Sequence, residues 1–569
     1  MRNISVFVCV FVFFSLNAQI MIDEDFQDWE NSSLIQEDKA NDGVYGIDFT
    51  NIRINNDDKY LYLLFNTTKE INLQSNNDIA LFIDIDEDEN TGYKINGMGA
   101  DISYFFGARY GFYYRNGSSI QIYHNDIGLI SLPTVTSDTF EMAIKREFKI
   151  GSYLIKLPEK IKLFLLQDTQ NGDKIPDNQG GLEYTMGDNK FILPAFEIDK
   201  KNDDDIRIMS YNVEKDHYFD NEPPYRRLIK AGRPDILCFQ EIYKHSSTTV
   251  RNKIQLYFGG NWYDAKIGSD LIVVSKYPIV KTKAIGGNGA FLINKSGKEI
   301  LIINNHLYCC DNDSGRQKEV DEIMQFIRRA KSNQGTFTIS KNTAVIILGD
   351  MNFVGSNRQR KTLIEGDILN EYNYGSDFLP DWDGTVFEDA KPITTGYPGT
   401  FTWNSDNSSY PKGRLDYVIY SGSVLQKQNG FALFTRLLSR DILEKYQMNA
   451  EDTDNASDHF PVFVDFKIID PMSVNENIKS LNDFIVSCYP NPVKNTLNID
   501  LKSKEYSGIY MSVIDNSGRT VIEKHMVVIE GFNKFKLDMN SLNPGIYYLR
   551  IYKPEKSTPA IKSLKIIID

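Results

Sequence analysis

Six polar clusters adjoin apolar, strand-like runs in the middle of the chain, and their residue types are those that bind cations and move protons. The clusters are Ser210-Tyr211-Asn212, Phe239-Gln240-Glu241, Asn305-His306-Leu307, Gly349-Asp350-Met351-Asn352, Arg414-Leu415-Asp416-Tyr417 and Ser457-Asp458-His459. A single junction of this kind is ordinary, because Asp and Asn end strands for turn reasons alone. Six in one block, with two of the chain's six histidines, are not explained by turn chemistry. Together they offer hard oxygen ligands and imidazoles for proton transfer.

The apolar runs beside these clusters predict the elements that would position them. Short runs rich in Val, Ile and Leu predict buried strands over residues 206–211, 236–239, 271–275, 300–304, 344–348 and 417–420. Val320, Ile323 and Ile327 recur at helical spacing, which predicts an amphipathic helix over residues 316–330. Strands mixed with helices over residues 205–467 indicate one α/β domain.

In chain order, the six clusters resemble the motifs of the endonuclease/exonuclease/phosphatase superfamily. Its members include deoxyribonuclease-like nucleases, abasic-site endonucleases, neutral sphingomyelinases and inositol polyphosphate phosphatases. The segment from Gly268 to Ile279 resembles the strand that precedes the family's central histidine motif. The likeness covers residues 205–467, and it implies a four-layer α/β (α+β) sandwich of two packed, mainly antiparallel sheets flanked by helices.

The resemblance implies hydrolysis of a phosphoester by in-line attack of water, assisted by a divalent cation. Asn212, Glu241 and Asp458 are the expected metal ligands, and their oxygen atoms suit Mg²⁺, Mn²⁺ or Ca²⁺. Arg316 and Arg414 are candidate ligands of the substrate phosphate, because a guanidinium group binds phosphate oxygens in pairs. For Arg316, a solvated first helical turn is an equally good interpretation.

Five residues are expected to carry the chemistry: His306, Asp350, Asn352, Asp416 and His459. By resemblance, Asp416 accepts a hydrogen bond from His459 and fixes its tautomer, so that His459 can bond the scissile phosphate or move a proton. Asp350 would orient or deprotonate the water, Asn352 would donate to a phosphate oxygen, and His306 would be a phosphate ligand or general acid. Residue types alone leave the acid and base roles of Asp350, His306 and His459 open.

The first residues have the layout of an export signal. Arg2 precedes an apolar stretch over residues 4–14, and residues 16–18 give a small-residue cleavage pattern. A buried helix or a membrane anchor is the alternative, but the apolar stretch is too short to span a bilayer and an acidic segment follows it. Residues 1–18 are therefore predicted to be a signal peptide, and no later stretch approaches transmembrane length.

Residues 19–197 alternate apolar and polar runs between Asn, Asp and Gly clusters, which is typical of an all-β domain. The block resembles the β-sandwich accessory domains, akin to carbohydrate-binding modules, that accompany secreted bacterial enzymes. Its aromatic residues 104–114 would stack on a polysaccharide ligand or would pack in the core. Two acidic loops resemble structural calcium sites, with acidic hairpin turns as the alternative. The candidate calcium ligands are Asp84, Asp86, Asp88, Asp168, Asp173 and Asp177.

The last block indicates an export address. Residues 485–569 follow a polar linker, residues 468–484, and resemble the type IX secretion sorting domain of Bacteroidota, a small β-sandwich. The likeness is carried by Cys488-Tyr489-Pro490-Asn491-Pro492-Val493 and Leu542-Asn543-Pro544-Gly545-Ile546. An unrelated immunoglobulin-like module is the alternative. The sorting domain implies that the type IX secretion machinery is a partner and that the protein acts outside the cell or at its surface.

Charge and cysteine content exclude some classes. The net charge is −14, and residues 20–204 hold most of the excess acid, with 17 basic and 33 acidic residues. Residues 205–467 carry 32 basic and 33 acidic residues, so this block lacks the basic footprint of a tight duplex binder. The cysteines form neither a disulfide framework nor a zinc pattern. Cys309 and Cys310 are adjacent and are expected to be free thiols, because a bridge between them would be strained.

These features predict a secreted, monomeric, divalent-metal-dependent phosphodiesterase. An export signal is unexpected for an abasic-site enzyme, and motifs specific for inositol lipids are missing. An extracellular nuclease acting on DNA or RNA is favoured, because Cys309-Cys310, which follow His306-Leu307-Tyr308 and precede Asp311-Asn312-Asp313, resemble bacterial extracellular nucleases of the family. A sphingomyelinase or phospholipase C-like enzyme would keep the mechanism and change the substrate. A surface-adhesion protein with an inactive scaffold is the non-enzyme alternative. Removal of residues 20–195 is expected to spare turnover of small soluble substrates.

Overall fold

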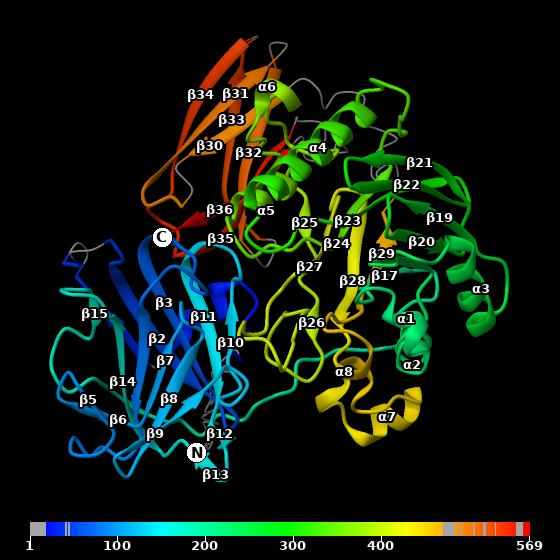
Figure 1. The fold of residues 1–569 in the computed structure, drawn as a ribbon. Helices are drawn as coiled ribbons and strands as arrows, with labels where there is room; N and C mark the ends of the chain where they lie inside the picture. The colour runs from blue at the N-terminus through cyan, green and yellow to red at the C-terminus, as the bar shows by residue number, and fades with distance from the viewer. Residues whose placement is uncertain are drawn as a thin grey trace, which may run out of the picture. The chain divides into compact units, whose positions relative to one another are not determined.

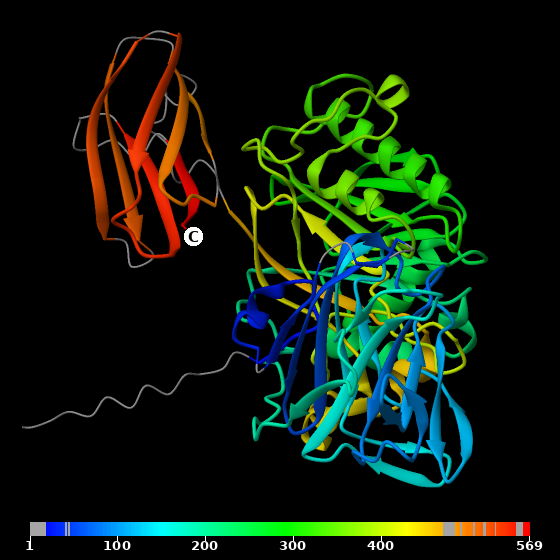
Figure 2. The same ribbon diagram turned by 90° about the vertical axis from the view of Figure 1, so that its left-hand side faces the viewer.

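A computed structural model of the chain describes residues 19–469, except 33, 40–41 and 44–45, and residues 484–568, except 490–491, 504–506, 516–518, 530 and 553–561. The chain divides into two compact units, Met1–Ile469 and Asp470–Asp569 (Figure 1, Figure 2). The predicted signal peptide and most of the predicted linker lie outside the described residues. Within the described ranges, no helix is both long enough and apolar enough to cross a membrane.

Two antiparallel sheets build the N-terminal part of the first unit. One has the order β1-β2-β3-β11-β10, with β1 Leu34–Glu37, β2 Phe49–Asn56, β3 Tyr60–Ile71, β10 Ile130–Leu132 and β11 Ser137–Lys145. The other has the order β15-β14-β4-β7-β8-β9, with β4 Ile79–Asp84, β7 Ile102–Phe105, β8 Tyr110–Arg115, β9 Ser118–Ile122, β14 Lys160–Gln167 and β15 Lys174–Ile175, and β16 Leu182–Thr185 also pairs with β14. The smaller elements are the 3-10 helix Phe26–Asn31 and two hairpins, β5 Tyr93–Ile95 with β6 Met98–Ala100 and β12 Glu147–Ile150 with β13 Tyr153–Lys156. Both large sheets contribute to one apolar core, which confirms the predicted β-sandwich.

The aromatic side chains of residues 104–114 lie on both faces of β7 and β8. Tyr104 and Tyr113 are buried in the core between the sheets. Tyr110, Phe112 and Tyr114 are half-buried on the opposite face, with neighbouring ring centroids 5.6 Å and 6.0 Å apart. Part of the stretch is therefore core and part is an accessible row of rings, while stacking on a polysaccharide stays a prediction.

The middle block of the first unit contains two further sheets. The first has the order β19-β20-β18-β17-β29-β28-β26, with β17 Ile206–Asn212, β18 Ile236–Gln240, β19 Tyr263–Ile267, β20 Leu271–Ser275, β26 Ile393–Thr394, β28 Leu425–Ala432 and β29 Val462–Ile468. The second has the order β21-β22-β23-β24-β27-β25, with β21 Ile279–Ile285, β22 Asn288–Lys295, β23 Lys298–His306, β24 Ala344–Asp350, β25 Glu388–Asp389 and β27 Asp416–Tyr420. Most pairs are antiparallel, whereas β17 with β18 and β23 with β24 are parallel. All six strands predicted for this block are present.

Helices cover the outer faces of these two sheets (Figure 1). They are α1 His217–Asp220, α2 Glu222–Gly232, α3 Ser247–Phe258, α4 Asp313–Lys331, α5 Arg358–Glu365, α6 Glu371–Tyr374, the 3-10 helix Thr435–Leu437, α7 Arg440–Tyr446 and α8 Asp452–Ala456. Ile323 of α4 packs in one cluster with Ile347 of β24. Leu228 of α2 packs in another with Met209 of β17. The inner faces of the sheets pack in a third cluster, so the predicted four-layer sandwich is confirmed.

The N-terminal sandwich and the middle block share that inner hydrophobic core. Ile22, Trp29 and Ile130 of the sandwich belong to the same buried cluster as Ile208 and Ile302 of the middle block. The backbone crosses as well, because the Ile22 amide donates to the Pro398 carbonyl at 2.9 Å. The sandwich is therefore packed against the middle block and is not a separate module on a flexible linker.

Thr134 joins the sandwich to the two segments of the middle block that adjoin β24 and β27. Its buried hydroxyl lies 2.8 Å from the carbonyl oxygen of Phe353 and 3.2 Å from that of Arg414. The amide of Thr136 donates to the Gly355 carbonyl at 2.8 Å. The sandwich thus supports backbone directly beside two of the polar clusters predicted to carry chemistry.

The second unit is a smaller sandwich. Its sheets have the orders β30-β31-β34 and β33-β32-β35-β36, with β30 Phe484–Tyr489, β31 Thr496–Ser503, β32 Ser507–Asp515, β33 Thr520–Val528, β34 Gly531–Asp538, β35 Gly545–Tyr552 and β36 Lys562–Ile568. Leu497 and Leu537 of the first sheet share a buried cluster with Val513 and Leu549 of the second. The predicted β-sandwich at this end of the chain is confirmed.

Candidate active site

The polar clusters meet because the strands that carry them are in register at their ends. The parallel strands β17 and β18 end side by side at Asn212 and Gln240. The parallel strands β23 and β24 likewise pair His306 with Asp350. Since β27 runs antiparallel to β24, its first residue, Asp416, also pairs with Asp350. Each sheet therefore presents its polar residues along a single edge.

Two histidine–carboxylate pairs face Asp350. Nδ1 of His306 lies 2.7 Å from Oδ2 of Asp270, and Nδ1 of His459 lies 2.8 Å from Oδ2 of Asp416. Each carboxylate holds the proton on Nδ1 and leaves Nε2 directed into the site. These Nε2 atoms lie 3.8 Å and 3.7 Å from Oδ2 of Asp350. The two imidazoles thus stand on either side of one carboxylate.

Asp270 is a site residue that the sequence pattern missed. The pattern gave most weight to polar residues that follow apolar strands, whereas Asp270 precedes β20. Because β20 runs antiparallel to β18, the beginning of β20 lies at the edge where β18 ends. Asp416 lies at a similar position, because it is the first residue of β27, which runs antiparallel to β24.

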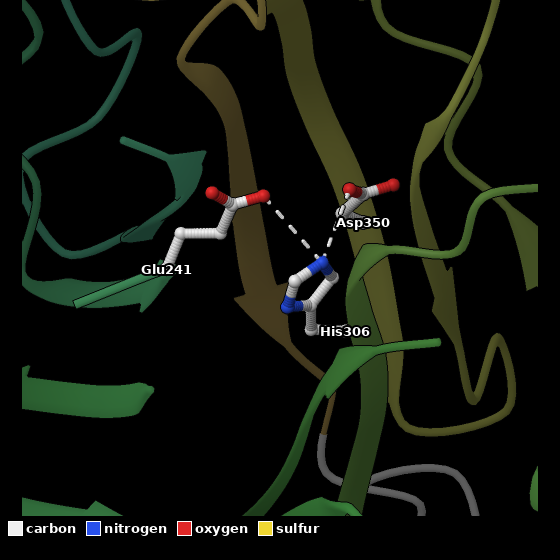
Figure 3. Close-up of side chains that lie close together, drawn as sticks. All are labelled: Glu241, His306 and Asp350. Carbon is white, nitrogen blue, oxygen red and sulfur yellow. Dashed lines mark ion pairs between the residues drawn. The ribbon is translucent and has the colours of Figure 1, made fainter. Parts of the chain in front are cut away.

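Glu241 and Asn212 complete the cluster around Asp350. Nδ2 of Asn212 lies 3.1 Å from Oε1 of Glu241 and 3.0 Å from Oδ2 of Asp350. Nε2 of His306 lies 3.6 Å from Oε1 of Glu241, so its ring stands between the two carboxylates (Figure 3). The ligand atoms of Glu241, His306 and Asp350 lie within 4.8 Å of one another. Two carboxylates this close repel each other, and a divalent cation with oxygen preference fits such a donor set.

Asp458 and Asn352 have other partners than those predicted. Oδ2 of Asp458 accepts a hydrogen bond from Nε1 of Trp403 at 2.9 Å. Among the described residues, Asp458 belongs to neither compact group of ligand atoms around Asp350. The Asn352 amide donates to the Leu307 carbonyl at 3.0 Å and to Asp350 at 3.1 Å. The metal role of Asp458 and the phosphate role of Asn352 stay predictions.

Arg316 and Arg414 point into the protein. The Arg316 guanidinium donates to the carbonyls of Tyr308 at 2.9 Å and Cys310 at 2.8 Å, and Arg414 pairs with Asp389. Both arginines are 0% exposed. These positions do not support the prediction that they bind substrate phosphate, because a fully buried guanidinium is out of reach of a substrate. Both instead hold backbone or a buried carboxylate in place.

The acidic residues predicted to bind calcium form different groups from those expected. The groups whose carboxylate oxygens lie within 4.8 Å of one another are Asp84, Asp86 and Asp101, and Asp38, Asp42 and Asp173. In the described parts of the chain, Asp88, Asp168 and Asp177 belong to neither group. Burial, with repulsion by Asp173, raises the pKa of Asp38 to about 7. Acidic clusters are thus present, while a calcium ion at either of them stays a prediction.

The two site histidines hold their protons strongly. Burial alone would lower the pKa of His306, but the hydrogen bond to Asp270 and the charge of Asp350 raise it to about 9. In the same way, burial opposes the charges of Asp416 and Asp350 at His459, whose pKa rises to about 10. In metal-free protein at neutral pH, two imidazolium ions therefore balance the surrounding carboxylates.

Metal-free protein is accordingly expected to lose stability as the pH rises. Each histidine has a folded-state pKa above its unfolded value of about 6.5, so the folded state binds more protons. This stabilisation is complete below about pH 6.5 and is lost as the pH rises through about 9 to 10. Tm measured in EDTA between pH 6 and 10.5 should fall, and the His306→Asn variant should show a shallower fall. A flat or rising Tm over this range would contradict the assignment.

Comparison with known proteins links both units to families. Residues 209–459 match the family model described as Endonuclease/Exonuclease/phosphatase family. Residues 487–569 match the model described as Secretion system C-terminal sorting domain. No curated protein matches the chain.

Solved structures that are similar to the chain include the following three. An endonuclease/exonuclease/phosphatase from Beutenbergia cavernae is 11% identical, with 64% of this chain and 99% of that chain covered and a TM-score of 0.33. The human Nocturnin catalytic domain with bound sulfate is 15% identical, with 47% of this chain and 95% of that chain covered and a TM-score of 0.30. D. rerio TDP2 complexed with a single-strand DNA product is 15% identical, with 47% and 100% covered and a TM-score of 0.30.

Proposed function

We propose that this chain, whose residues 209–459 form a domain of the endonuclease/exonuclease/phosphatase family, is an extracellular nuclease that hydrolyses DNA or RNA. The family match makes the chain a hydrolase of phosphodiester bonds. The acidic cluster at the site supports dependence on a divalent cation. The sorting domain makes it a secreted or cell-surface protein. The observation that carries the proposal is the convergence of His306 and His459, each on its own carboxylate, upon Asp350 beside Glu241.

The geometry favours distinct roles for these residues. Glu241 would hold Mg²⁺, with Mn²⁺ or Ca²⁺ as substitutes, and the bound cation would neutralise charge on the phosphoryl oxygens. Asn212 presents its Nδ2 to Glu241 and Asp350, while its Oδ1 accepts from the Glu214 amide, so its role as a metal ligand stays a prediction. Asp350 would orient the attacking water, because the imidazoles on either side keep it in place. His459 and His306 would donate from Nε2 to phosphoryl oxygens or to the leaving group. The inactive-scaffold alternative would be marked by missing catalytic residues, and the chain retains Glu241, His306, Asp350 and His459.

Exposed aromatic side chains next to the metal and histidine clusters favour a nucleic acid over a phospholipid. Tyr243, 42% exposed, follows Glu241 by two residues, and Tyr308, 55% exposed, follows His306 by two. Burial and the charges of Glu241 and Asp270 raise the pKa of Tyr243, so both site carboxylates act on its hydroxyl. Such rings stack on nucleobases, which a sphingomyelin head group does not offer.

The substrate assignment is tested by assaying four substrates side by side. Purified protein is expected to degrade plasmid DNA, single-stranded DNA or RNA faster than sphingomyelin when Mg²⁺ is present. EDTA should abolish the activity and added Mg²⁺ should restore it, since the carboxylate cluster offers the oxygen ligands for a cation. Activity that persists in EDTA would exclude the metal mechanism. Faster hydrolysis of sphingomyelin would replace the nuclease proposal by the phospholipase C-like alternative.

The other parts of the chain are proposed to export and target this activity. We propose a signal peptide at residues 1–18, the sandwich at 19–197, the catalytic domain at 205–467, a linker at 468–484 and the sorting domain at 485–569. Type IX secretion machinery would recognise the last of these, and the protein would act as a monomer. The row of Tyr110, Phe112 and Tyr114 is where the predicted polysaccharide ligand would bind. The test is a binding assay on an insoluble polysaccharide. The wild-type chain should be retained, and the Phe112→Ala variant should be retained less.

A further inference from the structure

Cys309 and Cys310 are exposed thiols in the loop that follows His306. Their Sγ atoms lie 2.6 Å apart, only slightly more than the roughly 2.05 Å of a disulfide bond. Cys310 has a φ of 61°, so the backbone already turns between the two side chains. The remaining cysteine described in the first unit, Cys238, is buried. Each of the two exposed thiols is therefore the nearest oxidation partner of the other.

A bridge between adjacent cysteines would be strained. Neighbouring Cα atoms stand about 3.8 Å apart, whereas disulfides usually join Cα atoms about 4.4–6.8 Å apart. Strained and exposed disulfides are easily reduced, and they are the labile or regulatory ones. The strain that argues against a permanent bridge between Cys309 and Cys310 thus favours one that forms and breaks with the redox conditions.

The loop that carries the two thiols is bonded directly to the candidate active site. The buried Arg316 guanidinium donates to the Cys310 carbonyl at 2.8 Å. At the start of the loop, the Leu307 amide donates to the Asp350 carbonyl at 3.0 Å, and the Leu307 carbonyl accepts from Asn352 at 3.0 Å. A change in backbone geometry at Cys310 would therefore act on a short segment that is hydrogen-bonded to Asp350 and Asn352.

We propose that Cys309 and Cys310 form a reversible vicinal disulfide that lowers turnover at the neighbouring active site. One thiolate attacks a sulfur of a small disulfide such as oxidised glutathione and releases one glutathione thiol. The other cysteine then attacks the mixed disulfide and releases the second glutathione. The two cysteines lose two electrons and two protons, and one oxidised glutathione becomes two thiols. The effect on turnover rests on the proposed function, whereas the disulfide itself is measured independently of it.

Mass spectrometry tests the disulfide on the full chain. The tryptic peptide of residues 299–316 contains both cysteines and no other. After oxidised glutathione, this peptide should resist alkylation and be lighter by two hydrogens, and after a phosphine reductant it should accept two alkyl groups. The matched Cys309→Ser variant should instead carry glutathione on Cys310. A wild-type peptide that is alkylated twice, carries glutathione or is crosslinked to a second chain after oxidation would overturn the proposal.

Rate measurements test the coupling with bis(p-nitrophenyl) phosphate, a substrate that needs no nucleic-acid binding. Oxidation should lower kcat/KM of the wild-type protein about 2- to 30-fold, the range that a modest coupling between neighbouring sites produces. Reduction should restore it, and the double variant Cys309→Ser/Cys310→Ser should respond to neither treatment. Equal rates for oxidised and reduced protein, with the disulfide demonstrated, would overturn the coupling to Asp350. If the protein hydrolyses bis(p-nitrophenyl) phosphate with this redox response but does not hydrolyse nucleic acids, only the nuclease proposal is contradicted.

Discussion

Replacement of His459 by alanine is expected to lower kcat for phosphodiester hydrolysis by about 10²- to 10⁴-fold, the usual contribution of a positioned acid or base. The imidazole is fixed at Nδ1 by Asp416 at 2.8 Å, and its Nε2 lies 3.7 Å from Asp350. No other described side chain holds this position on the Asp416 side of Asp350. KM should change much less, because the loss falls on groups that act during bond breaking.

Loss of the imidazole also removes one hydrogen-bond partner of the buried Asp416. The other partner, the Thr402 hydroxyl at 2.8 Å, remains. His459→Gln therefore accompanies the alanine variant, since its amide still offers a donor to Asp416 while it cannot transfer a proton near neutral pH. Both variants should lose a similar factor in kcat, and Gln should keep the higher Tm. His525→Ala, at an exposed histidine of the second unit, is the matched control and should leave kcat unchanged. An active, folded His459→Gln protein would refute the role given to this histidine.

The strand ends show how far sequence alone can locate such a site. Asn212, Asp350 and Asp416 could be found because apolar runs mark the strands, and register then brings their ends together. The pairing of His306 with Asp270 was not foreseen, because it depends on which way β20 runs between its neighbours. Strand direction is a property of the whole sheet, and the residues around Asp270 do not specify it.

The arginines show a second limit. Arg316 and Arg414 have the residue type that phosphate binding requires, and both lie next to residues of the site. A long side chain at such a position can turn outward or inward, and tertiary packing decides between them. For Arg414, the carboxylate of Asp389 and the ring of Tyr417, whose centroid lies 4.1 Å from the guanidinium carbon, favour the inward direction. Sequence spacing contains no information about these contacts.

The domain boundaries show a third limit, and they lead to the prediction with the largest structural effect. Composition separates an acidic β-rich block from the near-neutral block after it, which suggested that the first could be removed without loss. The structure predicts the opposite result. A chain that lacks residues 20–195 is expected to be insoluble or unfolded, and to hydrolyse even small diesters at less than a hundredth of the full-length rate.

The physical reason is the shared core. Truncation would expose the apolar surface that Ile22, Trp29 and Ile130 cover, and the loss of a single large core side chain already costs about 2–5 kcal/mol. Three such losses are comparable to the roughly 5–15 kcal/mol by which a domain is stable. Glu24, which pairs with the side chains of Arg360 and Arg414, would also be missing. Circular dichroism and a soluble-fraction assay measure the outcome.

A point variant separates support of the active site from bulk stability. Thr134→Val keeps the shape of the side chain but removes the hydroxyl that bonds the Phe353 and Arg414 carbonyls. It should lower the free energy of unfolding by about 1–3 kcal/mol, because a buried carbonyl loses its donor. It should also lower kcat at temperatures well below its Tm, since these carbonyls adjoin β24 and β27. Thr134→Ser keeps the hydroxyl and should restore both quantities.

The two experiments together decide whether the sandwich is part of the catalytic unit. If it only targets the enzyme, the truncated chain will unfold cooperatively at the full-length Tm and hydrolyse bis(p-nitrophenyl) phosphate at the full-length rate. If it only adds stability, Thr134→Val will lower Tm and leave kcat at 20 °C unchanged. Thr134 bonds the backbone of Phe353, three residues after Asp350, and of Arg414, two residues before Asp416. These hydrogen bonds predict neither result. They predict that kcat falls in the folded Thr134→Val protein and returns in Thr134→Ser.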